Sequence, residues 1–291
     1  NVSASVTASQ LIFDGSYFVG LQAAKASKEF YAVQSEKTEA DVRNAVSKSY
    51  YNCVVADENL SILEQNVDNV EDILNETKAM YETGFAEETD VDQFKLTLTD
   101  LENSITNAKR QKELSYRMLK FQMGLPLDNE LELTDKLDAL MAFEKSPEFL
   151  SKEFSPNKHV DMRLMLTSVH LQELNLKNTR TGYMPSLSAF MNHQQQVLAN
   201  ELTFDTWIPS TVWGLNLRVP IFTSFGTYNQ VQKAKIEFEQ TELQKDRVEE
   251  QLKLGAEQAK TEYLNALAVL ESRKESMELA KRIADRTLVK Y

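Results

Sequence analysis

Residues 46–81 read VSKSYYNCVVADENLSILEQNVDNVEDILNETKAMY and carry a strict seven-residue repeat. The repeat positions, and a small-to-apolar companion row three residues further on, are Val46, Cys53, Leu60, Val67, Leu74 and Tyr81, with Ser49, Ala56, Leu63, Val70 and Thr77. Such a repeat over five heptads is typical of a helix that packs lengthwise on other long helices. Because the surrounding run from Ser16 to Thr83 holds no proline, the sequence predicts one helix of about 100 Å.

The composition excludes several classes of protein. Of 291 residues, 26% are charged and 42% are hydrophobic, which is not the balance of a disordered or a polytopic helical membrane protein. We find no window approaching eighteen consecutive apolar residues and no signal peptide at the start. The net charge of −12 argues against nucleic acid, or an anionic lipid surface, as the main partner. The single cysteine, Cys53, excludes an internal disulfide, and we interpret it as a small buried apolar residue.

A strand and a second helix flank the long helix. Residues 2–13 alternate apolar and hydroxyl side chains, which predicts a strand with two unlike faces. Gly84 is placed to end the long helix as its C′ residue. A second helix, capped by Thr89 or Asp90, is expected to run to about Met123. The short link between the two helices predicts an antiparallel hairpin.

The second half of the chain repeats this organisation. Lys25–Phe30 resembles Lys233–Phe238 at an offset of 208, and a second seven-residue repeat runs from Ala256 to Tyr291. A strand that feeds a very long helix therefore occurs twice. The elements expected after the first hairpin are a connecting segment at 126–156, a helix at 157–182, strands at 185–197 and 213–221, and a helix at 227–291. We predict the domains as a first repeat, a connecting segment and a second repeat within one integrated structural unit, with bounds 1–125, 126–156 and 157–291.

The strand predicted at 213–221 has the sharpest alternation, and a loop holding Trp207 and Pro209 is expected before it. Its apolar face holds Trp213, Leu215, Leu217, Val219 and Ile221, and its other face holds Gly214, Asn216 and Arg218. This pattern fits a membrane-spanning strand whose polar face lines a water-filled lumen, although a strand of a soluble sandwich shows the same alternation.

The chain resembles the TolC-type family of outer-membrane efflux and secretion channels. The resemblance is carried, in order, by the segments Gln10–Gly15, Tyr81–Phe85, Thr89–Val91, Met184–Ser188 and Val219–Phe222. It implies a mainly α fold with membrane β-strands, in which long antiparallel helical hairpins form a periplasmic α-barrel below a trimeric outer-membrane β-barrel. The family has four strands in each protomer and an equatorial belt, here at 126–156. Only three strands are visible, so the resemblance implies a chain truncated at both ends.

The resemblance also assigns roles to particular residues. The hairpin turn at Thr83, Gly84 and Phe85 is expected to dock a periplasmic adaptor, or membrane fusion protein. Phe85 departs from the aliphatic residue that is usual at that place. The expected pore-lining residues are Asn216 and Arg218, and the expected lipid-facing residues are Trp213, Leu215, Leu217 and Val219.

No catalytic or metal-binding motif is found in the sequence. His159 and His170 are eleven residues apart, too far to share one metal on a helix, and the remaining histidine is His193. The sequence has no GxSxG, phosphate-loop or HExxH motif. We therefore expect no enzyme activity, no metal and no cofactor.

The function implied by the resemblance is that of a passive exit duct. A homotrimer in the outer membrane, extending into the periplasm, would serve a tripartite efflux pump or a type I secretion system. Contact with the adaptor or the inner-membrane pump at the helical hairpin tips would open it. The alternatives are a soluble periplasmic coiled-coil adaptor or scaffold, and an enzyme built on a helical scaffold.

Overall fold

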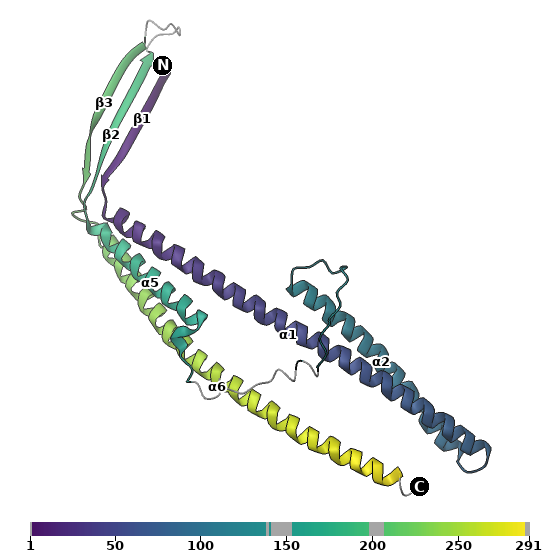
Figure 1. The fold of residues 1–291 in the computed structure, drawn as a ribbon. Coiled ribbons are helices and arrows are strands. Elements are labelled where there is room, and N and C mark those ends of the chain that lie inside the picture. Colours follow the sequence, from purple (N-terminus) through teal and green to yellow (C-terminus); the bar gives the residue numbers. More distant parts are fainter. Residues whose placement is uncertain (1, 138–139, 141–152, 198–206, 289–291) are drawn as a thin grey trace. The chain divides into compact units, whose positions relative to one another are not determined.

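The computed structural model describes residues 2–137, 140, 153–197 and 207–288 (Figure 1). Its elements in chain order are β1 (Val2–Phe13), α1 (Gly15–Glu82), α2 (Glu88–Gln122), η1 (Pro156–Lys158), α5 (Val160–Arg180), η2 (Thr181–Tyr183), β2 (Ser186–Val197), β3 (Trp207–Arg218) and α6 (Gly226–Leu288). The chain divides into two compact units, the first made of Asn1–Glu36 with Lys152–Tyr291 and the second of Lys37–Ser151. Among the described helices, none has an apolar stretch that could cross a membrane.

The strands form one antiparallel sheet in the order β1-β2-β3. The pairing of β1 with β2 runs from Val2 opposite Val197 to Phe13 opposite Leu187, with a register shift just before Phe13. The described residues therefore contain an open three-stranded sheet and no barrel. The mainly helical fold with long hairpins is confirmed, whereas the β-barrel and the α-barrel remain proposals.

The third strand differs from the prediction at both ends. β3 begins at Trp207, so the loop expected around Trp207 and Pro209 is wrong, and Pro209 pairs with Gln195. Proline lacks an N–H donor and is tolerated mainly on edge strands, and β3 is an edge of the described sheet. The strand ends at Arg218, so Val219 lies outside it.

Two helix starts also differ from the prediction. The residue before α2 is Glu87 rather than Thr89 or Asp90, and the Asp90 carboxylate accepts a hydrogen bond from the Glu87 backbone N–H at 3.0 Å. This bond supplies one of the partners that a helix start needs. α5 begins at Val160 because Pro156 opens a separate 3₁₀ turn, and the preceding residue, His159, accepts a hydrogen bond from the Asp161 N–H at 3.2 Å.

The second unit is built on the predicted seven-residue rows. In the row that starts at Val46, Cys53, Leu60 and Leu74 are buried. Both valines of this row are half-buried, and Tyr81 at its end is exposed. From α2, Leu119 is only 1% exposed. Polar contacts cross between α1 and α2, since the Tyr116 hydroxyl donates to the Asp57 carboxylate at 2.6 Å and the Lys112 ammonium lies 3.0 Å from it. The predicted hairpin is confirmed.

Truncating the core of this hairpin is expected to cost stability. Leu119→Ala should lower the free energy of unfolding by about 2–5 kcal/mol, because it leaves a cavity at a fully packed site. Leu114→Ala is the matched control, since Leu114 lies on the same helix and is 55% exposed. Denaturant unfolding followed by circular dichroism measures both. Equal losses for the two variants would contradict the assigned packing.

The first unit joins the sheet to three helical segments. Leu174 of α5 is 1% exposed and Ala234 of α6 is 4% exposed, and both belong to the interior of this unit. The Arg163 guanidinium contacts the Glu36 carboxylate at 2.6 and 3.3 Å, and this bond holds the pKa of Glu36 below its usual value. Close packing continues up to the strands, because a Cβ added at Gly182 would lie 3.2 Å from a methyl carbon of Thr227.

Candidate functional site

The turn between α1 and α2 has a well-defined backbone. Gly84 has φ of +82°, and its N–H donates to the Tyr81 carbonyl at 3.0 Å. The Phe85 N–H donates to the Met80 carbonyl at 2.8 Å, which completes a Schellman motif. The Thr83 hydroxyl donates back into the helix, to the carbonyls of Ala79 and Met80 at 3.0 Å each. The predicted role of Gly84 as the C′ residue is confirmed, and its docking role stays a prediction.

The surface of this turn combines one aromatic ring with several carboxylates. Phe85 is 86% exposed, although it is an aromatic residue held on a fixed backbone. No lysine or arginine lies between Lys78 and Lys95, a stretch whose acidic residues are Glu82, Glu87, Glu88, Asp90 and Asp92. A protruding ring among negative charges can contact a partner that offers an apolar pocket and positive charge.

The sheet has one apolar face that is exposed to its surroundings. Trp213, Leu215 and Leu217 are 80%, 68% and 63% exposed. Their partners on β2 in the register are Met191, Ala189 and Leu187, so the apolar row of β3 continues onto the next strand. The side chains predicted to face lipid on β3 thus share one face, except Val219, which lies beyond the strand end and is 52% exposed.

The opposite face of the sheet is largely polar, although Leu11, Ile208 and Val212 also lie on it. Asn216 and Arg218 lie there opposite Ser188 and Ser186. The hydroxyl side chains of β1 and their partners on β2 lie on the same face. The hydroxyl residues are Ser3, Ser5, Thr7 and Ser9, and their partners are Gln196, Gln194, Asn192 and Phe190. The structure places the predicted pore-lining residues together on this face, although their role in a pore stays a prediction.

Sequence reasoning missed one feature of the polar face. The ring of Phe190 lies over Gly214, where an added Cβ would come within 3.2 Å of the ring. A glycine inside a strand often marks such a close approach. The glycine in the predicted strand was the available signal for this contact. Identifying Phe190 as its neighbour, however, requires the register of the two strands.

The histidines do not form a metal site. His159 precedes α5, His170 lies 3.5 Å from Glu173 of its own helix, and His193 shares a hydrogen bond of 2.8 Å with Thr211. Over the part of the chain that the structure describes, no group of three or more potential ligands from His, Cys, Asp and Glu is found.

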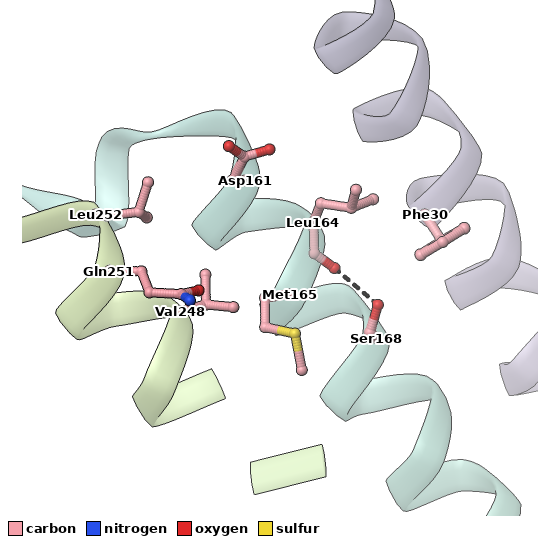
Figure 2. Close-up of a pocket in the computed structure, with 8 residues that line it drawn as sticks. All are labelled: Phe30, Asp161, Leu164, Met165, Ser168, Val248, Gln251 and Leu252. Atoms are coloured by element: carbon pink, nitrogen blue, oxygen red, sulfur yellow. Dashed lines mark hydrogen bonds between the residues drawn. The ribbon is translucent and has the colours of Figure 1, made fainter. Parts of the chain in front are cut away.

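An open groove of about 430 Å³ lies between α1, α5 and α6 (Figure 2). Its lining is largely apolar, and the Ser168 hydroxyl is bonded to the Leu164 carbonyl of its own helix at 3.0 Å. None of the residues that line this groove forms a nucleophile–base pair. The residues drawn in Figure 2 are Phe30, Asp161, Leu164, Met165, Ser168, Val248, Gln251 and Leu252.

Two tyrosines of the second unit bind carboxylates. The Tyr50 hydroxyl donates to Asp135, and this hydrogen bond is the main cause that raises the pKa of Tyr50 to about 12. Burial, and then the hydrogen bond to Asp57, also raise the pKa of Tyr116. Because these phenols lose their protons at higher pH when folded, the stability that they contribute is fully present below about pH 10 and is lost as the pH rises through the folded values.

Alkaline titration can test the first of these bonds. In Asp135→Asn, the pKa of Tyr50 should fall by about one unit or more, because the variant removes the carboxylate that disfavours the phenolate. The ultraviolet absorbance of tyrosinate follows the titration. The part of this signal that is missing in Tyr50→Phe is the titration of the Tyr50 phenol. An unchanged titration in Asp135→Asn would contradict the contact.

Comparison with known proteins supports the architecture described above. Residues 1–125 match the family described as "Outer membrane efflux protein". These residues belong to that family. The match confirms the predicted resemblance and the predicted location in the outer membrane.

Longer alignments extend over most of the chain. The outer membrane protein TolC of Vibrio cholerae is 24% identical over 247 residues, which cover 81% of this chain and 55% of that protein. The chain thus spans about half the length of this curated relative. Among solved structures, CusC is similar with a TM-score of 0.72 at 17% identity, over 93% of this chain and 63% of that one. The Campylobacter jejuni outer membrane channel CmeC is similar with a TM-score of 0.62 at 17% identity, over 84% and 59%. These structural likenesses show the fold.

Proposed function

We propose that this chain is the protomer of a homotrimeric outer-membrane channel-tunnel. It acts as a passive exit duct for a tripartite efflux pump or a type I secretion system. A periplasmic adaptor and an inner-membrane pump contact the helical hairpin tips and open the duct. The outer-membrane family of residues 1–125 and the channel named in the CmeC structure support this proposal.

The observation that carries the proposal is an apolar sheet face combined with two open edges. β1 and β3 are both edges of the described sheet, and Trp213, Leu215 and Leu217 expose the apolar face. In lipid, unpaired backbone N–H and C=O groups at a sheet edge are too costly to persist. Strands of other copies can pair with these edges, and a closed barrel satisfies both requirements.

The long helices supply the second part of the duct. α1 has 68 residues and α6 has 63, so each has a length of roughly 95–100 Å at 1.5 Å per residue. Each is the next element after a strand, α1 after β1 and α6 after β3, and both strands end at the same end of the sheet. Helices of this length fit a tunnel that leads from the membrane into the periplasm. The Phe85 turn at the far end of α1 is then a contact for partners.

A soluble adaptor or scaffold is the second candidate. Its support is the antiparallel hairpin of α1 and α2, which a coiled-coil adaptor also needs. An adaptor, however, has no use for a sheet face on which Trp213 is 80% exposed.

Fractionation and conductance distinguish these candidates. The channel proposal expects the full protein to sediment with the outer membrane and to be extracted by detergent as a trimer that conducts ions in a planar bilayer. Release by salt or osmotic shock as a soluble protein would favour the adaptor and reject the channel.

A further inference from the structure

The strands and helices of the first unit meet at one end of the sheet. β1 leads into α1, α5 leads through η2 into β2, and β3 leads into α6 (Figure 1). The register places Phe13 opposite Leu187 and Leu187 opposite Leu217, so all three junctions lie at the same level. We call this level the junction.

Exposed aromatic side chains gather at the junction. They are between 52% and 78% exposed, and we name them the aromatic collar: Tyr17, Phe18, Tyr183, Phe222, Phe225 and Tyr228. The ring centroids of Phe13 and Phe18 are 6.3 Å apart, so the collar continues from the end of β1. Aromatic rings at the end of an exposed apolar sheet face are typical of the boundary between membrane and water.

The charge near the junction is opposite to that of the whole chain. Residues 2–28, 173–197 and 207–239 hold seven basic and four acidic residues, a local net charge of 7 − 4 = +3, although the net charge of the chain is −12. The acidic residues are Asp14, Glu173, Glu237 and Glu239. Arg218 lies on the polar face of the sheet, with Asn216. The six others lie on helices and are all exposed, and we name them the basic belt: Lys25, Lys28, Lys177, Arg180, Lys233 and Lys235.

The belt is available to an external partner. Three of its members form an ion pair with a half-buried or exposed glutamate of their own helix, at distances of 2.8–3.8 Å. Exposed pairs of this kind are weak and are easily exchanged. Within the described residues, Lys25, Lys28 and Arg180 form no ion pair. Asp14 is engaged at the start of α1, where it accepts a hydrogen bond from the Ser16 N–H at 2.7 Å.

Most of the belt lies within electrostatic range of lipid headgroups. Arg180 ends α5 at the junction, and along their helices Lys233 and Lys25 lie within roughly 15 Å of it. The headgroup layer of one leaflet is about 7 Å deep. Electrostatic attraction extends about 8–10 Å beyond it at physiological salt. Phosphate groups in this layer can therefore attract five members of the belt, whereas Lys28, thirteen residues along α1 and roughly 20 Å from its start, lies beyond this reach.

We propose that the basic belt binds anionic phospholipid headgroups of the leaflet that faces the periplasm. The aromatic collar sets the depth of the protein in that leaflet, and the belt selects the anionic lipids around it. This inference rests on the proposed placement of the sheet in the membrane. The net charge of the chain argued against an anionic lipid surface as the main partner. Lipid headgroups, however, interact with the local charge at the junction, which is positive.

Lipid binding to the detergent-solubilised protein tests the proposal. Native mass spectrometry compares the binding of phosphatidylglycerol with that of phosphatidylcholine. The wild-type protein should prefer phosphatidylglycerol, and salt should weaken the preference. The variant Lys25→Gln/Arg180→Gln/Lys233→Gln should lose the preference by about tenfold or more, since each basic residue near an anionic surface contributes roughly a fivefold effect.

The matched control removes the same charge elsewhere on α6. Lys274→Gln/Lys281→Gln/Arg282→Gln should keep the wild-type preference. No preference in the wild-type protein, or equal losses in the two variants, would overturn the proposal. Loss of anion conductance without any change in lipid binding would instead assign the belt to the cargo path.

Conductance in phosphatidylcholine bilayers separates this inference from the proposed channel. The belt variant should conduct as the wild-type protein does, because neutral lipids do not need the belt. If the wild-type trimer fails to conduct, the channel proposal fails, whereas the lipid preference can still be measured in detergent.

Discussion

Phe85→Glu is expected to abolish export through the pump while trimers still assemble in the outer membrane. The ring is 86% exposed on a turn held by two backbone hydrogen bonds, so its removal should leave the fold intact. As a buried aromatic anchor in a complex, it would contribute about 2 kcal/mol or more to adaptor binding, a loss of roughly thirtyfold in affinity. A glutamate there also adds a carboxylate to an acidic surface. Drug susceptibility, adaptor affinity and trimer recovery are the three measurements.

Gly84→Asp tests the same turn with a matched control in the chain. Gly84 has φ of +82° and Gly124 has φ of +69°, both end a helix through the same pattern of hydrogen bonds, and neither has an atom within 4 Å of an added Cβ. Each substitution should cost about 1–2 kcal/mol of backbone strain. Gly84→Asp should abolish export and Gly124→Asp should not. Unaltered resistance in Gly84→Asp and Phe85→Glu would remove the docking role from this turn.

Leu215→Arg is expected to prevent stable assembly in the outer membrane. Leu215 is 68% exposed on the apolar face of the sheet, between Trp213 and Leu217. An arginine that faces lipid costs about 2–4 kcal/mol for each protomer at the bilayer midplane and about 0–1 kcal/mol near the interfaces. Leu215 lies two residues from Leu217 at the junction, so its cost falls between these values. A trimer would pay this cost three times. The amount of heat-resistant trimer in outer-membrane fractions, and folding into vesicles, measure the effect.

The neighbouring residue provides the control for this substitution. Asn216 lies on the opposite, polar face, in the same strand and the same register. Asn216→Arg should therefore assemble nearly as the wild-type protein does and should change only ion selectivity. If Leu215→Arg assembles normally while Asn216→Arg does not, the two faces have the reverse orientation. If both assemble normally, the sheet does not contact lipid.

Local sequence predicted those features that depend on neighbours along the chain. The seven-residue rows identified Cys53, Leu60 and Leu74 as buried, because a helix brings residues seven apart onto one face. Gly84 was recognised as the helix end, since a left-handed backbone favours glycine. The alternation in residues 2–13 likewise predicted β1 with the bounds that the structure shows.

Features that depend on distant segments could not be predicted in this way. Pro209 was assigned to a loop, because its place at a sheet edge follows only from pairing with Gln195. The predicted start of α2 was wrong because glutamate is not a residue type that commonly precedes a helix. The hydrogen bond from the Glu87 N–H to the Asp90 carboxylate is visible only in the structure. The contact of Phe190 with Gly214 requires the register of two strands.

The sequence alone determined the long helices, their repeat after strands and the family of the first 125 residues. Periodicity and short motifs are local properties, so they can be recognised without any knowledge of the fold. Only the tertiary structure decided which strand faces are continuous and where charge gathers. Net charge adds all residues together, whereas the basic belt exists because strand pairing brings the ends of three helical segments to one level.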